Sequence, residues 1–596
     1  MRSLVVLVLL CAAALAQQPT TVPTHEEEVV VTGTYDAVPL EETDRAVSTI
    51  SVGENPVLFR DWVDVLQQDP SLDIRQRAPG VQADLSIRGS SFGQTLVLLN
   101  GLRVNDAQSA HHNLDLPFPF AELERVEVLR GSGSTLYGSD ALGGAVNFIT
   151  AVPEHHELRL GAAAGNFGTN QQSGRAAFGF RRWSQSVSFT RELSTGFMPD
   201  RDYRNLALAS TSAVRSKLGV SRLLFGYSDR PFGADQFYGR FNSWERTKGW
   251  MVAASQQLGS RTQVAFGYRR HTDIFVLYRD RPAVYKNDHL SESYQAAVRR
   301  SEPLSRNTRL HYGAEFYRDN IDSSNLGSHV RDRGAVYAAF DARALKRFSL
   351  TVGAREEFFT GGARKFSPSV SGGYWLSERI KLRASASHAF RLPTYTDLYY
   401  RDPANVGDPD LRPESAWSYD LGAQFTLSNH VAADVTVFHR RERDVIDYVR
   451  SSPANQWQAR NFQRLDFTGV ETAVRWQFGS HILALAYTGL TGAQESLDGV
   501  QSKYVFNYPV HSGSATWTGR MPFRMDGRAR IGTLKRFERD AYPLLEFMAT
   551  RQFGNVRPFV QFTNVTNTGY EEIPGVRMPG RAVLVGVEVV FGKRSN

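Results

Sequence analysis

From Pro153 onward, the chain consists mainly of segments of about ten residues in which apolar and polar side chains alternate. Ile380, Leu382 and Ala384, for example, would face one side of a strand. Lys381 and Arg383 would face the other, because successive side chains of a strand point to opposite faces. Any single segment could belong to a soluble protein. Their repetition, separated by turn residues, is typical of a transmembrane β-barrel.

Short turns between these segments allow the strands to be counted. They fall near Arg182, Ser216, Ser260, Leu304, Leu345, Ser377, Asn429, Ser480, Met521 and Gly554. Longer connections, such as 229–245 and 391–413, lie between them. A barrel entered from the periplasmic side has one short inner turn fewer than half its number of strands. The ten turns therefore predict a 22-stranded antiparallel transmembrane barrel over residues 152–596.

The N-terminus has the pattern of an export signal. Arg2 precedes an apolar core, and Ala14-Leu15-Ala16 forms a small-residue cleavage site, so residues 1–16 are predicted to be a signal peptide. Cys11 is the only cysteine and leaves with the signal. The mature chain is therefore expected to lack disulfides, cysteine zinc sites and cysteine nucleophiles. The net charge of +8 is spread along the chain without a Lys/Arg block, so nucleic acid is not an expected partner.

A glycine-rich stretch over 122–150 marks a second kind of structure. Its sequence is ELERVEVLRGSGSTLYGSDALGGAVNFIT, with two short apolar strands around closely spaced glycines. Such spacing indicates tight turns and close backbone approach, and predicts a compact α+β element enclosed by something larger. It has neither the lysine of a phosphate-binding loop nor the third glycine of a dinucleotide-binding fingerprint, so neither motif is assigned.

This stretch, together with LSIRGSSFGQTLVLLNGLRVND at 85–106, closely resembles the plug domain of TonB-dependent outer-membrane receptors. FRLPTYTDLYY at 390–400 and FTNVTNTGYEEIPGVRMPGRAVLVGVEVVF at 562–591 resemble their barrels. One departure is that five residues follow Phe591, whereas such barrels usually end on an aromatic. The resemblance implies an α+β plug at 41–151 inside the barrel. It also implies a monomer in the bacterial outer membrane that actively imports a scarce nutrient, without covalent chemistry or a cofactor.

The resemblance further implies three partners: TonB with its inner-membrane complex, outer-membrane lipid, and a small-molecule ligand. A candidate TonB box lies in a flexible lead over residues 17–40 and comprises Glu28, Val29, Val30, Val31, Thr32 and Gly33. A β-prone hexamer behind a polar tail is suited to adding a strand to a partner's sheet. The alternative is an ordinary first strand.

Two plug arginines and two barrel carboxylates are predicted to meet. Arg88 and Arg130 are placed on two predicted plug strands, and Glu414 and Glu471 on predicted barrel strands. A buried arginine requires a carboxylate partner, because an isolated buried charge is very costly. The resemblance implies that these residues form an ion cluster between plug and barrel. The alternative is that each pairs locally.

The outward ligand site is predicted at the long plug loop 105–120 and the long barrel loops at 197–205, 229–245 and 391–412, since binding residues concentrate on loops above a rigid scaffold. Candidate contacts are Ser90, Gln94, Asn105, Gln108, His111, His112, Phe237, Tyr238, Tyr399 and Tyr400. Adjacent histidines point opposite ways on a strand, so neither His111-His112 nor His155-His156 is expected to hold a metal as a pair.

The ligand expected from the resemblance is cobalamin or a related corrinoid, because the compact length and GVRMPGR resemble cobalamin receptors; a ferric siderophore or haem is the alternative. Cobalamin receptors of this class order their outer loops with calcium, which takes several oxygen ligands. The candidates are Asp200, Asp202, Asp229 and Asp235, although interleaved arginines favour salt bridges.

Two other classes of function are weaker. Gly89-Ser90-Ser91-Phe92-Gly93 matches a nucleophile elbow, but the following residues predict a strand rather than the required helix, so an outer-membrane enzyme is not favoured. A passive porin would need neither plug nor box.

Overall fold

The computed structural model describes residues 29–592 except Val31, Glu54, Lys346 and 495–498. The predicted signal peptide, Glu28 and the residues after Gly592 lie outside this range. Within the described range, no helix combines the length and apolar character needed to cross a membrane.

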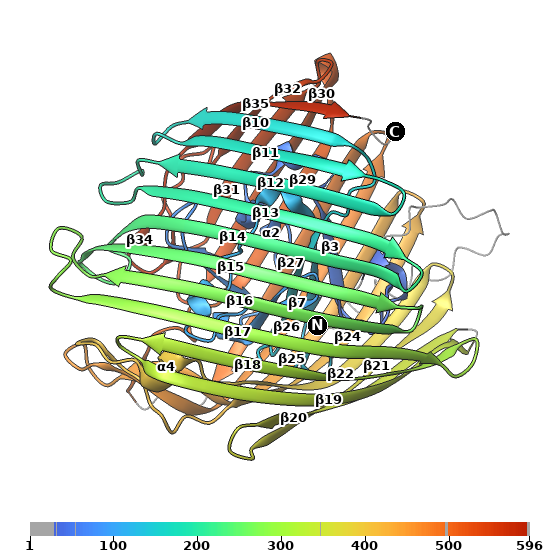
Figure 1. The fold of residues 1–596 in the computed structure, drawn as a ribbon, viewed down its shortest axis with the longest axis horizontal. Coiled ribbons are helices and arrows are strands. Elements are labelled where there is room, and N and C mark those ends of the chain that lie inside the picture. Colours follow the sequence, from blue (N-terminus) through green and yellow to red (C-terminus); the bar gives the residue numbers. More distant parts are fainter. Residues whose placement is uncertain (1–28, 31, 54, 346, 495–498, 593–596) are drawn as a thin grey trace, which may run out of the picture.

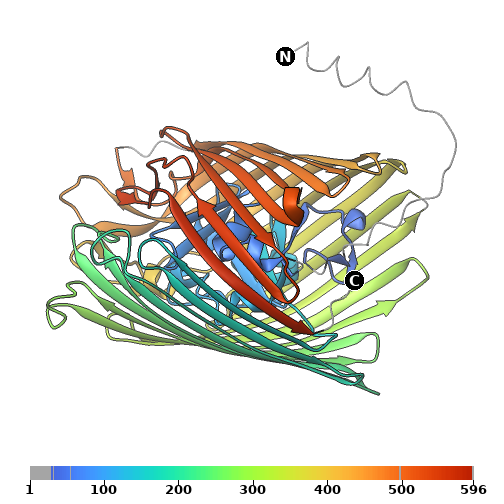
Figure 2. The same cartoon turned by 90° about the horizontal axis from the view of Figure 1, so that it is seen from above.

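The barrel closes on itself through 22 long antiparallel strands, as predicted (Figures 1 and 2). In chain order they are β10 (Glu157–Gly165), β11 (Asn170–Gly179), β12 (Trp183–Ser194), β13 (Tyr203–Ser216), β14 (Gly219–Asp235), β15 (Asn242–Leu258), β16 (Thr262–Val276), β17 (Lys286–Pro303), β18 (Thr308–Ser323), β19 (Gly327–Leu345), β20 (Phe348–Phe359), β21 (Arg364–Ser377), β22 (Ile380–Arg391), β24 (Glu414–Ser428), β25 (Val431–Arg450), β26 (Trp457–Phe478), β27 (His481–Gln494), β29 (Pro509–Met521), β30 (Met525–Arg536), β31 (Tyr542–Arg551), β32 (Val556–Thr563) and β35 (Ala582–Gly592). First and last strands pair, with Leu158 opposite Phe591.

The ten predicted short turns connect successive strands at one end of the barrel, from β11–β12 near Arg182 to β31–β32 near Gly554. The connections at the other end include helix α4 (Tyr395–Tyr399), the short strands β23 (Asn405–Val406) and β28 (Gln501–Ser502), and the hairpin of β33 (Glu571–Ile573) and β34 (Val576–Arg577). The segment 229–245 was expected to be a long loop. It is mostly strand, because β14 and β15 pair as far as Asp235 and Asn242.

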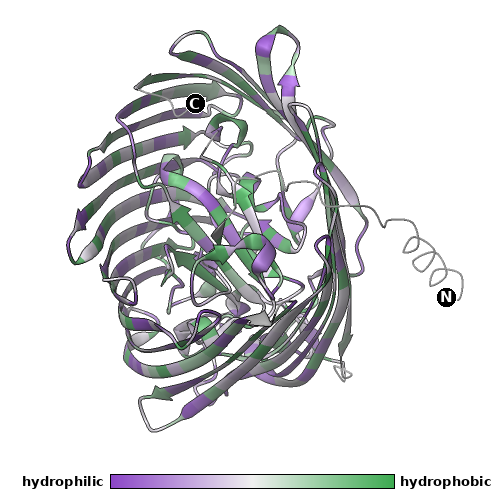
Figure 3. Cartoon of the chain, turned by 90° about the vertical axis from the view of Figure 1, so that its right-hand side faces the viewer, coloured by the Kyte–Doolittle hydropathy of each residue, from purple (hydrophilic) through white to green (hydrophobic). Residues whose placement is uncertain are grey.

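The barrel wall reverses the polarity of a soluble protein. On β22, Leu382 is exposed, whereas Lys381 and Arg383 are only 1% and 4% exposed. Figure 3 shows the corresponding alternation of hydrophobic and hydrophilic residues along the strands. Apolar side chains therefore face the lipid, and polar side chains face the interior.

The plug fills the interior of the barrel (Figure 2). Its main sheet has the order β3 (Val47–Ser51), β8 (Leu123–Arg130), β9 (Gly144–Thr150), β6 (Thr95–Leu99), β7 (Leu102–Arg103). The hairpin of β4 (Leu72–Gln76) and β5 (Ala83–Ile87) and the helices α2 (Trp62–Leu66) and α3 (Ser134–Tyr137) complete it. β1 (Val29–Val30) pairs with β2 (Val38–Pro39). Short 3-10 turns lie at Leu40–Glu42, Pro56–Leu58, Phe92–Gln94, Ala110–His112 and Phe120–Glu122, with another at Pro522–Arg524 in the barrel.

Candidate functional site

A buried ion cluster joins the plug to the barrel. Arg88, at the end of β5, donates from Nε and Nη2 to the two carboxylate oxygens of Glu471 on β26, at 2.7 Å each. Its Nη1 donates to Asp420 on β24 at 2.5 Å. Arg130 also reaches Glu471, at 3.2 Å. A bidentate pair of this kind satisfies both oxygens of a carboxylate that has no access to water. The structure thus brings Arg88, Arg130 and Glu471 together.

Glu414 does not join this cluster. Its carboxylate accepts from Arg391 Nε at 2.5 Å and from the plug residue Gln94 at 3.2 Å. The same Gln94 amide donates to Glu442 at 3.0 Å. Glu414 therefore contacts the plug through an amide rather than an arginine. Asp420, the partner that was not predicted, lies six positions after Glu414 on the same inward face of β24.

Further ion pairs link the plug to the barrel wall, with a carboxylate from the plug in each case. They are Asp44–Lys381 at 2.9 Å, Asp64–Arg528 at 2.5 Å, Asp73–Arg536 at 2.7 Å, Asp106–Arg269 at 2.6 Å and Asp115–Arg230 at 2.5 Å. Their members are mostly buried, so the plug is held by charge pairs as well as by packing. Removing one partner of such a pair strongly destabilises the fold, because it leaves a buried charge uncompensated.

The candidate TonB box lies against the plug sheet. Val29 and Val30 pair with Pro39 and Val38 in a two-stranded ribbon. The Thr32 amide donates to the Glu127 carboxylate at 2.8 Å, and the Asn147 side chain donates to the Thr32 hydroxyl at 2.9 Å. Of the six predicted residues, Glu28 and Val31 lie outside the described range. The described part of the hexamer is therefore tethered to β8 and β9.

An aromatic group occupies the outward end of the plug. Phe92 stacks on His111 with ring centroids 4.3 Å apart, and Tyr504 meets both rings edge-on at 5.3 and 5.9 Å. His111 Nδ1 lies 2.7 Å from an Asp84 carboxylate oxygen. Burial lowers the pKa of His111, an effect only partly opposed by Asp84, so the ring is neutral at pH 7. Phe92, His111 and Tyr504 are half-buried, so they present ring surface to a ligand.

Cationic side chains surround this aromatic group. Lys503 Nζ lies 5.1 Å from the Tyr504 ring centroid, and Arg450 lies 4.2 Å from that of Trp457. The plug's Arg75 lies 5.8 Å from the Phe92 centroid. Sequence reasoning missed Phe92 and Tyr504 as contacts. Phe92 was considered only as part of the Gly89–Gly93 match to a nucleophile elbow. Tyr504 lies in a loop where no motif was found.

The four polar contacts predicted for a ligand are used inside the protein instead. Ser90 Oγ accepts from the Ile87 amide at 3.1 Å, and Gln94 bonds Glu414 and Glu442. Asn105 bridges the backbones of Thr95 and Val97. Gln108 donates to Asp273 at 2.8 Å. Ser90, Gln94 and Gln108 are at most 4% exposed, and the partners of Gln94 and Gln108 are carboxylates of the barrel wall.

The predicted aromatic and histidine contacts divide between two surfaces. Tyr238 is 37% exposed and donates to Glu245 at 2.6 Å, and Phe237 beside it is buried over Arg201. Tyr399 stacks on His329 at 3.8 Å. Tyr400 packs with Tyr399 close to the plug's Ala107. His112 turns away from His111 and is buried, with Nδ1 3.2 Å from Asp115.

The four aspartates proposed for calcium do not gather around one point. Asp200 and Asp202 share Arg279, which lies 3.2 Å from Asp200. Asp229 receives two bonds from Arg246, at 2.8 and 2.7 Å. Asp235 accepts from Gln236 at 2.7 Å. Arginine therefore occupies the oxygens of three of the four, in line with the salt-bridge alternative.

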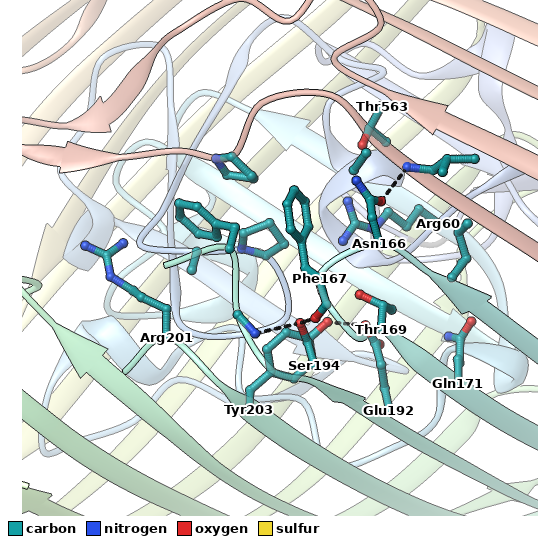
Figure 4. A pocket seen from close by; sticks show the side chains of 18 of the residues that line it. Arg60, Asn166, Phe167, Thr169, Gln171, Glu192, Ser194, Arg201, Tyr203 and Thr563 are labelled. Atoms are coloured by element: carbon teal, nitrogen blue, oxygen red, sulfur yellow. Dashed lines mark hydrogen bonds between the residues drawn. The ribbon is translucent and has the colours of Figure 1, made fainter. Parts of the chain in front are cut away.

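A recess opens beside the outward end of the plug (Figure 4). Plug residues Arg60, Ala78 and Pro79 form one wall, and the β10–β11 turn with Phe167 forms another. Tyr203 and Glu192 also line it, and the Tyr203 hydroxyl donates to the Glu192 carboxylate at 2.5 Å. Its mixed aromatic and polar lining makes it a second candidate binding surface.

Comparison with known proteins matches residues 39–145 to the family described as TonB-dependent Receptor Plug Domain, and residues 137–570 to TonB dependent receptor-like, beta-barrel. The chain is 23% identical over 482 residues to the vitamin B12 transporter BtuB of Photobacterium profundum, covering 74% of this chain and 76% of the relative. It is 26% identical over 523 residues to the iron-regulated outer membrane virulence protein of Vibrio cholerae, covering 77% and 76%. Its fold is similar to that of the siderophore receptor PirA from Pseudomonas aeruginosa, with a TM-score of 0.72 and 18% identity over 91% of this chain and 99% of that one.

Proposed function

We propose, from the premise that this chain belongs to the TonB-dependent receptor family, that it binds and imports a cobalamin-like corrinoid. Members of this family carry out TonB-dependent transport of large substrates across the outer membrane. A barrel of this size would be an open passage without the plug, so transport requires the plug to rearrange. The proposal concerns which ligand triggers that rearrangement.

The aromatic group at the outward end of the plug supports a large amphipathic ligand. Phe92, His111 and Tyr504 offer ring faces and edges in three orientations. Neutral rings bordered by hydrogen-bonding groups suit a corrinoid, which has a broad, mostly uncharged surface. The similarity to a vitamin B12 transporter over about three quarters of both chains is the observation that carries this choice.

A ferric siderophore is the second candidate, and one observation favours it. Lys503 and Arg450 lie within 6 Å of aromatic rings around the same surface. Cations that lie against aromatic rings attract anionic aromatic chelates through charge and stacking together. The relative from Vibrio cholerae is described as iron-regulated, which is compatible with this alternative.

Coupling to TonB would proceed through the N-terminal hexamer. Ligand contact at Phe92 and His111 displaces the β5–β6 and β7–β8 connections of the plug, and the second of these leads into β8. Thr32 is tethered to β8 and β9 of the same domain. Release of that tether exposes a β-prone segment that adds to a sheet of TonB. Deletion of residues 28–33 should therefore abolish uptake and leave ligand binding intact. Uptake that survives the deletion would contradict the coupling.

The ligand is tested by direct binding to the purified protein. Equilibrium binding is measured with cyanocobalamin, a ferric catecholate chelate and haemin, each with and without calcium. Tight binding of cyanocobalamin is expected. No measurable affinity for it, alongside tight binding of the ferric chelate, would reverse the order of the two candidates. An increase in affinity with calcium would support a structural calcium ion in the loops.

Two variants locate the binding surface. Phe92→Ala and Tyr504→Ala should each weaken binding by about 10-fold or more, since a buried aromatic contact contributes more than about 1.4 kcal/mol. Phe553→Ala, an exposed aromatic at the opposite, short-turn end of the barrel, is the matched control and should bind as the unaltered protein does. Equal binding by all three variants would place the ligand elsewhere, such as the recess of Figure 4.

A further inference from the structure

A histidine and carboxylate cluster is buried between the plug loop 105–120 and strand β16. It contains His112 and Asp115 from the plug and His271 from the barrel, each buried. One ligand atom from each of the three lies within 4.8 Å of the others. None of these contacts belongs to the outward aromatic surface, because His112 points away from His111 into the wall.

Two of the three separations between these ligand atoms match those between neighbouring ligands of a tetrahedral metal ion. Asp115 Oδ2 lies 3.2 Å from His112 Nδ1 and 3.5 Å from His271 Nε2. Tetrahedral bonds of about 2.0–2.1 Å to nitrogen and oxygen set neighbouring ligand atoms roughly 3.4 Å apart. The other oxygen of Asp115 accepts from Arg230 at 2.5 Å, so Oδ2 is the oxygen that remains for an ion.

The opposite nitrogen of each histidine faces a second carboxylate. His271 Nδ1 lies 2.8 Å from Asp106 Oδ2, and His112 Nε2 lies 3.4 Å from Asp273 Oδ2. Asp106 is held by Arg269 and Asp273 by Gln108. Histidines that bind metals generally donate their other N–H to such a carboxylate, which sets the tautomer and orients the ring. Both histidines therefore have the carboxylate partner that metal-binding histidines generally have.

The charge of the cluster points the same way. Four carboxylates, from Asp106, Asp115, Asp273 and Glu245, are buried here together. The guanidinium groups paired with them within the described chain are those of Arg269 and Arg230. With neutral histidines and all four carboxylates ionised, two negative charges would remain uncompensated in a medium where unpaired charge is very costly. A divalent cation would neutralise them.

We propose that His112 Nδ1, His271 Nε2 and Asp115 Oδ2 bind a divalent transition-metal ion of the zinc class, which joins the plug loop to the barrel wall. Imidazole and carboxylate ligands in this ratio suit zinc, and three protein ligands leave a fourth position for water. The site is independent of which nutrient is imported, because it is buried away from the outward surface. The bound ion would hold the plug loop against the barrel wall until the plug rearranges.

The test measures the metal in the purified full-length protein, prepared without a histidine tag, stripped with a chelator and dialysed against zinc. Elemental analysis should find about one zinc per chain. In a parallel sample loaded with cobalt, the visible absorption should be that of a tetrahedral nitrogen and oxygen site. Zinc loading should raise the thermal stability of the protein.

Variants assign the metal to these residues. His112→Gln combined with His271→Gln should lose the zinc and the cobalt spectrum, and His439→Gln, which alters a histidine on another barrel strand, should keep both. Asp115→Asn provides a milder change if the double variant does not fold, and should weaken zinc binding at least about 10-fold. A protein that binds no stoichiometric zinc, or variants that retain it, would overturn the site. Protonated histidines would then compensate the carboxylates.

Discussion

Arg88 and Glu471 face each other across the boundary between plug and barrel, joined by two hydrogen bonds of 2.7 Å although they are 383 positions apart in the chain. Both residues are 2% exposed. Their contact, shared with Asp420 and Arg130, makes the seating of the plug depend on a charge pair within the barrel. Since each partner relies on the other for compensation, the pair can be tested from either side.

Arg88→Ala should lower the stability of the seated plug by about 3–5 kcal/mol, because it leaves buried carboxylates without their main partner. The urea midpoint for loss of amide protection in the plug measures this. The Arg88→Ala/Glu471→Ala double variant should cost less than the sum of the single changes. Arg261→Ala is the control. It breaks an exposed pair with Glu302 and should cost less than about 1 kcal/mol. Equal effects of Arg88→Ala and Arg261→Ala would contradict the role of the cluster.

Asn147→Ala should release the candidate TonB box in the absence of ligand. It removes the bond from the Asn147 side chain to the Thr32 hydroxyl and leaves the box sequence unchanged. Capture of the purified receptor by the periplasmic domain of TonB should then rise before ligand is added. Thr150→Val is the matched control. Thr150 lies on the same strand as Asn147, and its hydroxyl accepts a hydrogen bond from Asn100 rather than bonding to the box. A rise with both variants would indicate general loosening of the plug.

Glu572 should make the docking of the β33–β34 hairpin onto the plug depend on pH. Burial raises the pKa of this carboxyl from 4.5 to about 8, and its oxygen accepts from the Gln76 amide at 2.5 Å. The pKa of Glu572 is higher in the docked state than in the unfolded chain, so its protonated form favours docking. This contribution to the stability of the docked hairpin is complete below about pH 4.5 and is lost as pH rises toward 8. Hydrogen exchange of the Gln76 amide should therefore become faster, after correction for its intrinsic pH dependence, between these values. Glu572→Gln should remove that trend, and a trend that persists in the variant would assign it to another group.

Gly138→Ala should disturb the seating of the plug. Gly138 has a φ of +78°, and an added Cβ would lie 1.9 Å from Glu357 Oε1 on the barrel wall. Backbone strain of about 1–3 kcal/mol would add to this clash. Gly361→Ala separates the two effects, since Gly361 has a φ of +89° and an added Cβ there would meet no atom within 4 Å. The Gly138 variant should lower the urea midpoint for the plug more than the Gly361 variant does. Equal midpoints would mean that the Glu357 side chain moves aside without lowering the stability of the seated plug.

Several features were determined by the sequence alone, because they depend on local chemistry. Alternation along segments such as 380–387 places successive side chains on opposite faces, and the ten turns separate the strands, so the 22-stranded barrel could be counted before any contact was known. The glycine spacing around Gly138 likewise indicated an element enclosed by something larger. These inferences require no information about which distant residues meet.

The partners of individual side chains were decided only by the tertiary structure. Inward-facing carboxylates at Glu414, Asp420 and Glu471 were equally available to Arg88 by sequence, and barrel closure with plug seating selected the last two. The same closure turned Gln94 into the wall and brought His271 to His112. A local pattern states which face a residue occupies. Which residue it meets depends on strand register and on how the plug is seated, and both arise from interactions among hundreds of residues.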